Sequence, residues 1–151
     1  MSRSFFSVTT YAVRLFIITR IFMADLTPGQ IGWIDISVED AESLKTFYSR
    51  VAGWTSQAVD MEGYDDHCMI PPGAEAPVAG ICHARGANAV LPPQWLIYIT
   101  VADLDQSLHD CAELGGSAIT PIREGGGGRF VVIRDPAGAV CALYQKVQEE
   151  T

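Results

Sequence analysis

Alternating apolar and polar positions, followed by an amphipathic stretch, occur twice in this chain at equivalent spacing. Five residues of the first copy recur in the second: Ile34, Ile36, Val38, Asp40 and Gly53 reappear as Ile97, Ile99, Val101, Asp103 and Gly116. In each copy, apolar residues at every second position predict a strand, the Asp predicts a helix N-cap, and the Gly predicts the helix end. The shared order of these signals favours two similar units within one domain.

Each unit is predicted to contain one helix and four strands. The first helix carries an apolar stripe of Ala41, Leu44, Phe47, Tyr48 and Val51. The second is capped by Asp103 or Asp105 and carries Leu104, Leu108, Cys111 and Leu114. The predicted strands cover residues 31–38, 56–61, 67–70 and 78–83, then 95–101, 117–121, 129–134 and 139–144. Residues 87–93 link the two β-α-β-β-β units, and the glycines at 125–128 are expected to form a flexible rim loop.

Strand alternation also predicts which side chains share a face. Ile34, Ile36 and Val38, with their counterparts in the second copy, are expected to lie beneath the helices. The opposite face carries Trp33, Asp35 and Ser37 in the first copy and Leu96, Tyr98 and Thr100 in the second. Half-polar faces on two related sheets predict a shared concave surface, which is where we expect a small-molecule ligand.

Composition narrows the class of protein. The chain has 151 residues, of which 48% are hydrophobic and 19% charged, as expected for one folded globular domain. A net charge of -8 repels nucleic acid, so we predict no nucleic-acid partner. The cysteines lack CxxC spacing, and we interpret them as reduced thiols of a cytoplasmic protein. They are Cys68, Cys82, Cys111 and Cys141.

The first 22 residues differ from the rest, because they carry Arg3, Arg14 and Arg20 but no acidic residue. These arginines interrupt the apolar run well short of the ~20 residues that cross a bilayer, so no membrane partner is predicted. A transit peptide is one alternative. We favour an extension outside the fold over residues 1–27, a domain over 28–147 and a tail over 148–151.

Four phrases carry a resemblance to a known family. They are IDISVEDAESLKTFYSRVAGW at 34–54, PVAGI at 77–81, ITVADLD at 99–105 and GRFVVIRDPAGAV at 128–140. Over residues 30–146 the chain resembles the vicinal oxygen chelate superfamily, which includes glyoxalases, extradiol dioxygenases and bleomycin-resistance proteins. The resemblance implies an α+β fold of two βαβββ modules, about residues 30–86 and 94–146, curled around a cavity. It also implies a homodimer.

In metal enzymes of that superfamily, His or Glu residues at fixed strand positions hold the ion. The resemblance places these positions at Trp33, Leu96, Ala142 and the stretch Ala79–Ile81, where no side chain donates to a metal. The chain is more similar to a metal-free branch, so we predict no metal and no cofactor. A substitute zinc site from His67, Cys68, Cys82 and His83 is disfavoured, since neighbours on a strand point to opposite faces.

Asp35 is the strongest candidate for a functional residue, because Asp is disfavoured inside a strand. It is either a structural hydrogen-bond partner of Tyr98, Thr100 or a backbone amide, or a ligand anchor or general base. His83 is a second candidate acid or base. The expected ligand-binding residues are Trp33, Asp35, Ser37, Leu96, Tyr98, Thr100, Ala142 and Tyr144.

Two functions of different class follow from these candidates. The first is a metal-free protein that binds an apolar or aromatic small molecule, similar to glyoxalase and bleomycin-resistance proteins. The alternative is a metal-free lyase, isomerase or hydrolase that uses Asp35 as acid or base, with His83 or Tyr98, in the same cavity.

Overall fold

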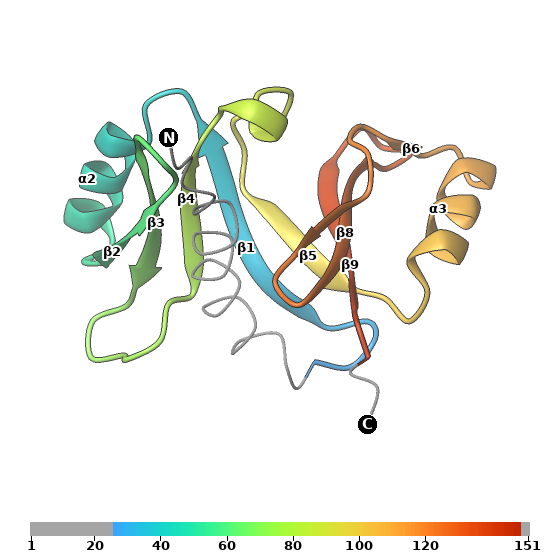
Figure 1. Cartoon of the computed structure of the whole chain (residues 1–151), viewed down its shortest axis with the longest axis horizontal. Helices are drawn as coiled ribbons and strands as arrows, with labels where there is room; N and C mark the ends of the chain where they lie inside the picture. The colour runs from blue at the N-terminus through green and yellow to red at the C-terminus, as the bar shows by residue number, and fades with distance from the viewer. Residues whose placement is uncertain (1–25, 149–151) are drawn as a thin grey trace, which may run out of the picture.

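The computed structural model of the chain describes residues 26–148 and consists of two βαβββ modules (Figure 1). The first module comprises β1 (Ile31–Val38), α2 (Ala41–Val51), β2 (Thr55–Asp60), β3 (Asp65–Ile70) and β4 (Ala79–His83). The second comprises β5 (Leu96–Thr100), α3 (Leu104–Glu113), β6 (Ser117–Ala118), β7 (Arg123–Gly125), β8 (Gly128–Arg134) and β9 (Val140–Lys146). A 3-10 turn, η1 (Gly86–Asn88), lies between them. The predicted N-terminal extension falls almost wholly outside the described residues.

All nine strands join one mixed sheet in the order β2-β3-β4-β1-β5-β9-β8-β6, with β7 paired to β8. The modules meet where β1 runs antiparallel to β5. In that register Trp33 lies opposite Tyr98, and Asp35 lies opposite Leu96. Because Trp33 and Leu96 are repeat equivalents, as are Asp35 and Tyr98, the pairing is symmetric about an approximate dyad. The α+β fold of two related modules is thus as the repeat predicted.

The two helices cover the outer face of the sheet at its opposite ends (Figure 1). Each begins at the predicted Asp: Asp40 accepts a hydrogen bond from the Ser43 backbone N–H at 3.0 Å, and Asp103 accepts one from that of Gln106 at 3.0 Å. These bonds satisfy donors that a helix N-terminus leaves free. Beneath α2 a cluster forms around Ile36, Ala41, Met69, Ala79 and Ile81. Beneath α3 the cluster comprises Leu104, Val131, Ile133 and Leu143.

A third apolar cluster lies on the other face of the second half-sheet. It consists of Leu91, Leu96, Val132, Val140 and Ala142, with Tyr98 and Ile119 packed against it. Leu91 comes from the segment between the modules, which folds back over this face. The inner surface of the second half is therefore largely filled by apolar side chains, whereas the corresponding surface of the first half is not.

Three local predictions were wrong. Residues 125–128 do not form a loop: β7 and β8 make a hairpin, and Gly126 and Gly127 occupy its turn with φ of 62° and 78°. Two successive positive φ angles favour glycine and match the twist of the flanking strands. The predicted strand over 117–121 is confined to β6. Phe47 and Val51 are exposed by 52% and 66%, so the buried stripe of α2 is narrower than its apolar pattern.

No helix within residues 26–148 is long and apolar enough to span a bilayer.

Candidate functional site

A cavity of about 440 Å³ opens on the inner face of the sheet and is lined by both modules. Its size lies within the range of small-molecule sites. From the first module come Trp33, Asp35 and Ser37 of β1, Asp66 and Cys68 of β3, and Gly80 and Cys82 of β4. From the second come Tyr98, Arg123, Phe130 and Tyr144, while Tyr64, Arg85 and Asn88 belong to connecting segments.

Five of the predicted ligand-binding residues line this cavity. They are Trp33, Asp35, Ser37, Tyr98 and Tyr144. Alternation along β1, β5 and β9 placed them on the inner face, and the sheet brings them together.

The other three predicted ligand-binding residues do not line the cavity. Leu96 and Ala142 are fully buried in the third apolar cluster, together with Leu91 from the segment between the modules and Val132, the neighbour of Ala142 on β8. Thr100 is also buried, and its hydroxyl has no hydrogen-bond partner among the described residues. All three have the strand parity of the cavity residues, but they are buried and do not line the cavity.

Asp35 lies in the cavity wall and is only partly exposed. The Tyr98 hydroxyl donates a hydrogen bond to Asp35 Oδ2 at 2.9 Å, which is one of the partners expected from the sequence. The other oxygen, Oδ1, is buried and has no hydrogen-bond partner among the described residues. Burial raises the pKa of Asp35 from 3.8 to about 7. Three neighbours lower this pKa, but by less: Tyr98 through its hydrogen bond, Arg123 through its positive charge, and the Trp33 side chain. Near neutral pH this carboxyl is poised between its two protonation states.

Two thiols share the cavity wall with Asp35. Burial raises the pKa of Cys68 to about 11 and that of Cys82 well above its ordinary value, and nearby carboxylates add to both effects. Because their pKa values are raised, both thiols are neutral at neutral pH. They are therefore unreactive there, since the thiolate is the nucleophilic form. All four cysteines of the chain are free thiols, of which Cys68 is buried and the others are partly exposed.

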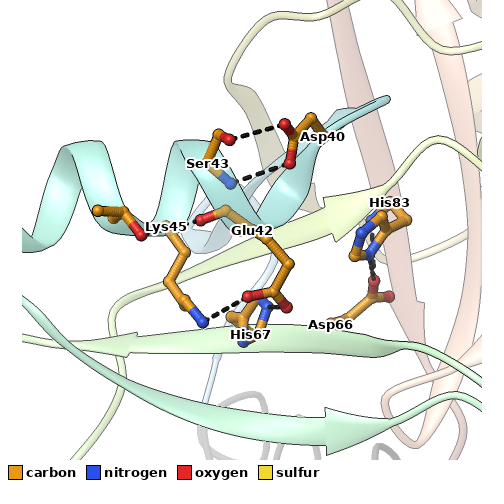
Figure 2. A network of polar contacts seen from close by, with 8 residues as sticks. Asp40, Glu42, Ser43, Lys45, Asp66, His67 and His83 are labelled. Atoms are coloured by element: carbon orange, nitrogen blue, oxygen red, sulfur yellow. Dashed lines mark hydrogen bonds and ion pairs between the residues drawn. The ribbon is translucent and has the colours of Figure 1, made fainter.

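The histidines near the first half-sheet are tied to carboxylates (Figure 2). His67 Nε2 lies 2.7 Å from Glu42 Oε1 on α2, and the other oxygen of Glu42 accepts from Lys45 at 2.6 Å. His83, a candidate acid or base from the sequence, is buried and does not line the cavity. Its backbone N–H donates to Asp66 Oδ1 at 2.8 Å, and its ring Nδ1 lies 3.4 Å from the same oxygen without a hydrogen bond. The structure thus places His83 behind the wall, with Asp66 as the group that faces the cavity.

Arg85 and Arg123 line the cavity but were not identified from the sequence. Arg123 lies on β7, opposite Phe130 on β8, and its guanidinium sits 4.9 Å from the centre of that ring. Its position became visible only with the β7–β8 hairpin. The Gly126–Gly127 pair, flanked by strand-like residues, is the signal that would have revealed it.

Comparison with known proteins assigns the family. A family model described as the Glyoxalase/Bleomycin resistance protein/Dioxygenase superfamily matches residues 30–143. The chain belongs to this superfamily. Among curated members, it is 32% identical over 127 residues to "Putative glyoxylase CFP32" of Mycobacterium tuberculosis, covering 78% of this chain and 46% of that protein. It is 27% identical over 136 residues to "Anthracycline biosynthesis protein DnrV" of Streptomyces peucetius, covering 82% and 50%.

The chain therefore spans about half the length of the curated relatives that it matches. Among solved structures, a hypothetical protein, BH1468, from Bacillus halodurans superimposes with a TM-score of 0.55 at 14% identity, covering 83% of this chain and 99% of that one. The likeness to BH1468 is one of fold alone.

The side chains at the superfamily's metal positions do not fit a metal in this member. The resemblance places three of these positions at Trp33, Leu96 and Ala142 and the fourth within Ala79–Ile81 on β4, where Gly80 lies opposite Asp35. A Cβ on Gly80 would lie 3.2 Å from Asp35 Cβ and 3.4 Å from the Trp33 ring, so the indole covers this glycine. None of the side chains at these positions carries a metal donor. Within residues 26–148, no group of three or more His, Cys, Asp or Glu residues is arranged to hold an ion.

Proposed function

We propose that this protein binds a small, largely aromatic molecule in the cavity between its two modules, without using the superfamily's metal site. The observation that carries the proposal is the lining itself. The aromatic side chains of Trp33, Tyr98, Phe130 and Tyr144 line the same cavity as the carboxyl group of Asp35, which has one oxygen without a hydrogen-bond partner among residues 26–148. A mostly apolar cavity with a few convergent polar groups is typical of small-molecule sites, and the polar groups fix the ligand's orientation.

The names of the relatives support an aromatic ligand. Two curated relatives are named for anthracycline biosynthesis, DnrV and DauV, at 27% and 28% identity. Anthracyclines contain fused rings, and flat rings stack well on aromatic side chains. We therefore propose a polycyclic aromatic compound as the ligand class. Because the chain spans about half of each relative, their full activities do not transfer with the name.

A second candidate function is proton transfer by Asp35 on a ligand bound in the same cavity. It is favoured by the pKa of Asp35, which burial raises to about 7. A general acid or base works best when its pKa is close to the working pH. The Tyr98 hydroxyl donates a hydrogen bond to Oδ2 at 2.9 Å and so holds the carboxyl in place, while Oδ1 has no partner among the described residues. Such a reaction would be an isomerase, lyase or hydrolase step.

One experiment tests the first proposal and separates the two candidates. Purified protein is incubated with a panel of fused-ring aromatic compounds, and bound compound is recovered by ultrafiltration and identified by mass spectrometry. We expect saturable retention that Asp35→Asn and Trp33→Leu weaken, whereas Asp65→Asn, an exposed carboxylate on β3, leaves it unchanged. Compound recovered unchanged supports binding alone, and altered product that disappears in Asp35→Asn supports catalysis. No retention, or retention insensitive to both cavity variants, contradicts the proposal.

We also propose that two copies of the chain associate. The resemblance to the superfamily implies a homodimer, and two copies of this chain would match the length of the relatives, which are about twice as long as their matched region. Light scattering after gel filtration tests this directly, and a mass equal to one chain at micromolar concentration contradicts it.

A further inference from the structure

Two arginines line the cavity without forming a salt bridge among the described residues. Among residues 26–148, neither Arg85 nor Arg123 forms a salt bridge, although the chain carries a net charge of -8. Arg129, by contrast, lies outside the cavity and pairs with Asp105 at 2.9 Å. Acidic partners are abundant in this chain, so an arginine kept unpaired in a cavity has its charge available to a ligand.

Arg123 is the better positioned of the two. Its Nη1 donates to the Asn88 side-chain oxygen at 3.0 Å, and its guanidinium lies over the Phe130 ring. These two contacts hold the planar group in place. Its Nε is buried and has no hydrogen-bond partner among the described residues. The guanidinium as a whole lines the cavity, so an anionic oxygen of a ligand can accept a charge-assisted hydrogen bond from its other N–H groups.

Aromatic side chains beside Arg123 would contact the rings of such a ligand. Tyr98 and Phe130 lie with ring centres 5.9 Å apart at a tilt of 51°, and both line the cavity with Arg123. The positive charge of Arg123 is also close enough to Asp35 to lower the pKa of that carboxyl. Because burial raises the pKa of Asp35 to about 7, this carboxyl is largely protonated, and hence uncharged, below pH 7. It would then not repel an anion bound beside Arg123.

We propose that Arg123 is a specificity-determining residue, and that the ligand is an aromatic compound whose anionic oxygen, a carboxylate or an ionised phenol, accepts a hydrogen bond from its guanidinium. This inference rests on the proposed function, because it names the chemistry of the molecule that the cavity binds. It adds a requirement that an apolar cavity alone does not impose: the anion binds better than a neutral compound with the same rings.

Two probes with one ring system test this requirement. Calorimetry at pH 6 compares 2-naphthoate with neutral 2-naphthalenemethanol, for the wild-type protein and three variants. We expect the wild type to prefer the carboxylate by about ten- to a hundred-fold, as for one charge-assisted hydrogen bond. Arg123→Gln keeps a side-chain amide but loses the charge, so it is expected to abolish the preference while the alcohol binds as before. Arg123→Lys is expected to restore part of it, and Arg129→Gln is the control that leaves it unchanged.

The outcomes separate this inference from the function on which it depends. Equal affinity of the wild type for both probes overturns the inference and leaves aromatic binding intact. The inference is also overturned if Arg123→Gln and Arg123→Lys lower the affinity for both probes equally while their unfolding midpoints are unchanged. Arg123 would then shape the cavity without distinguishing charged from neutral ligands. If neither probe binds the wild type, the proposed function is contradicted, and the inference that rests on it is contradicted as well.

Discussion

Replacing Asp35 by Asn is expected to stabilise the protein at neutral and alkaline pH and to have little effect in acid. Asn resembles the protonated carboxyl in shape, still accepts the hydrogen bond from the Tyr98 hydroxyl, and cannot ionise. In the wild type the folded chain holds the pKa of Asp35 at about 7, whereas the unfolded chain returns it to about 3.8. The raised value means that folding favours the protonated form.

The sign and size of the effect follow from proton linkage. Below pH 3.8 both states are protonated, and Asp35 contributes its full stability. Between pH 3.8 and 7 the unfolded state releases the proton while the folded state keeps it, so the free energy of unfolding falls by about 1.4 kcal/mol per pH unit. Above pH 7 the loss reaches about 4 kcal/mol and stays constant. Asp35→Asn escapes this loss.

Urea denaturation of both proteins at several values between pH 4 and 8.5 measures the difference. The groups that face Asp35, namely Tyr98, Arg123, Asp66 and Cys82, are present in both proteins. Their own titration therefore cancels to first order in the comparison. We expect the advantage of Asp35→Asn to grow with pH and to level off near pH 7, whereas the exposed control Asp65→Asn shows no such growth. A difference that is the same at every pH, or one that favours the wild type above pH 7, would refute the reasoning.

Three further predictions concern named contacts. Tyr98→Phe removes the hydrogen bond that lowers the pKa of Asp35, so we expect a loss of about 1–3 kcal/mol that is larger at pH 8 than at pH 4 in urea denaturation; an equal loss at both contradicts it. Gly128→Ala adds a methyl group that meets a β9 carbonyl and lies 2.7 Å from an aromatic ring, so thermal unfolding should show a loss of at least about 2 kcal/mol, and a neutral result would argue against this register. Asp103→Ala removes the N-cap of α3 and should cost about 1 kcal/mol, whereas Asp103→Asn, which retains the acceptor, should restore most of it.

The architecture was readable from the sequence because its signals are local and repeated. Asp40 and Asp103 begin their helices as expected, since an N-cap needs only a side chain and the next turn. The period-two pattern of β1 and β5 predicted their faces, and the symmetric register of Trp33 against Tyr98 follows from the same repeat. The partner of Asp35 was also within reach, because alternation placed Tyr98 on the same face of the equivalent strand.

The extent of the cavity was not readable in the same way. Leu96 and Ala142 share the inner face with Trp33, yet they are buried in a cluster with Leu91 and do not line the cavity. Which part of the inner face stays open depends on where a connecting segment packs, and no pattern within one strand predicts this. Arg123 was missed for a related reason, because a hairpin between β7 and β8 was interpreted as a loop.

The sequence by itself determined that this chain folds as two βαβββ modules, because strand period and helix caps are properties of single segments. Only the tertiary structure decided that part of the second module's inner face is filled by apolar side chains, and that Arg123 lines the same cavity as Asp35. Both depend on packing between residues far apart in the chain, where space taken by one side chain is lost to every other.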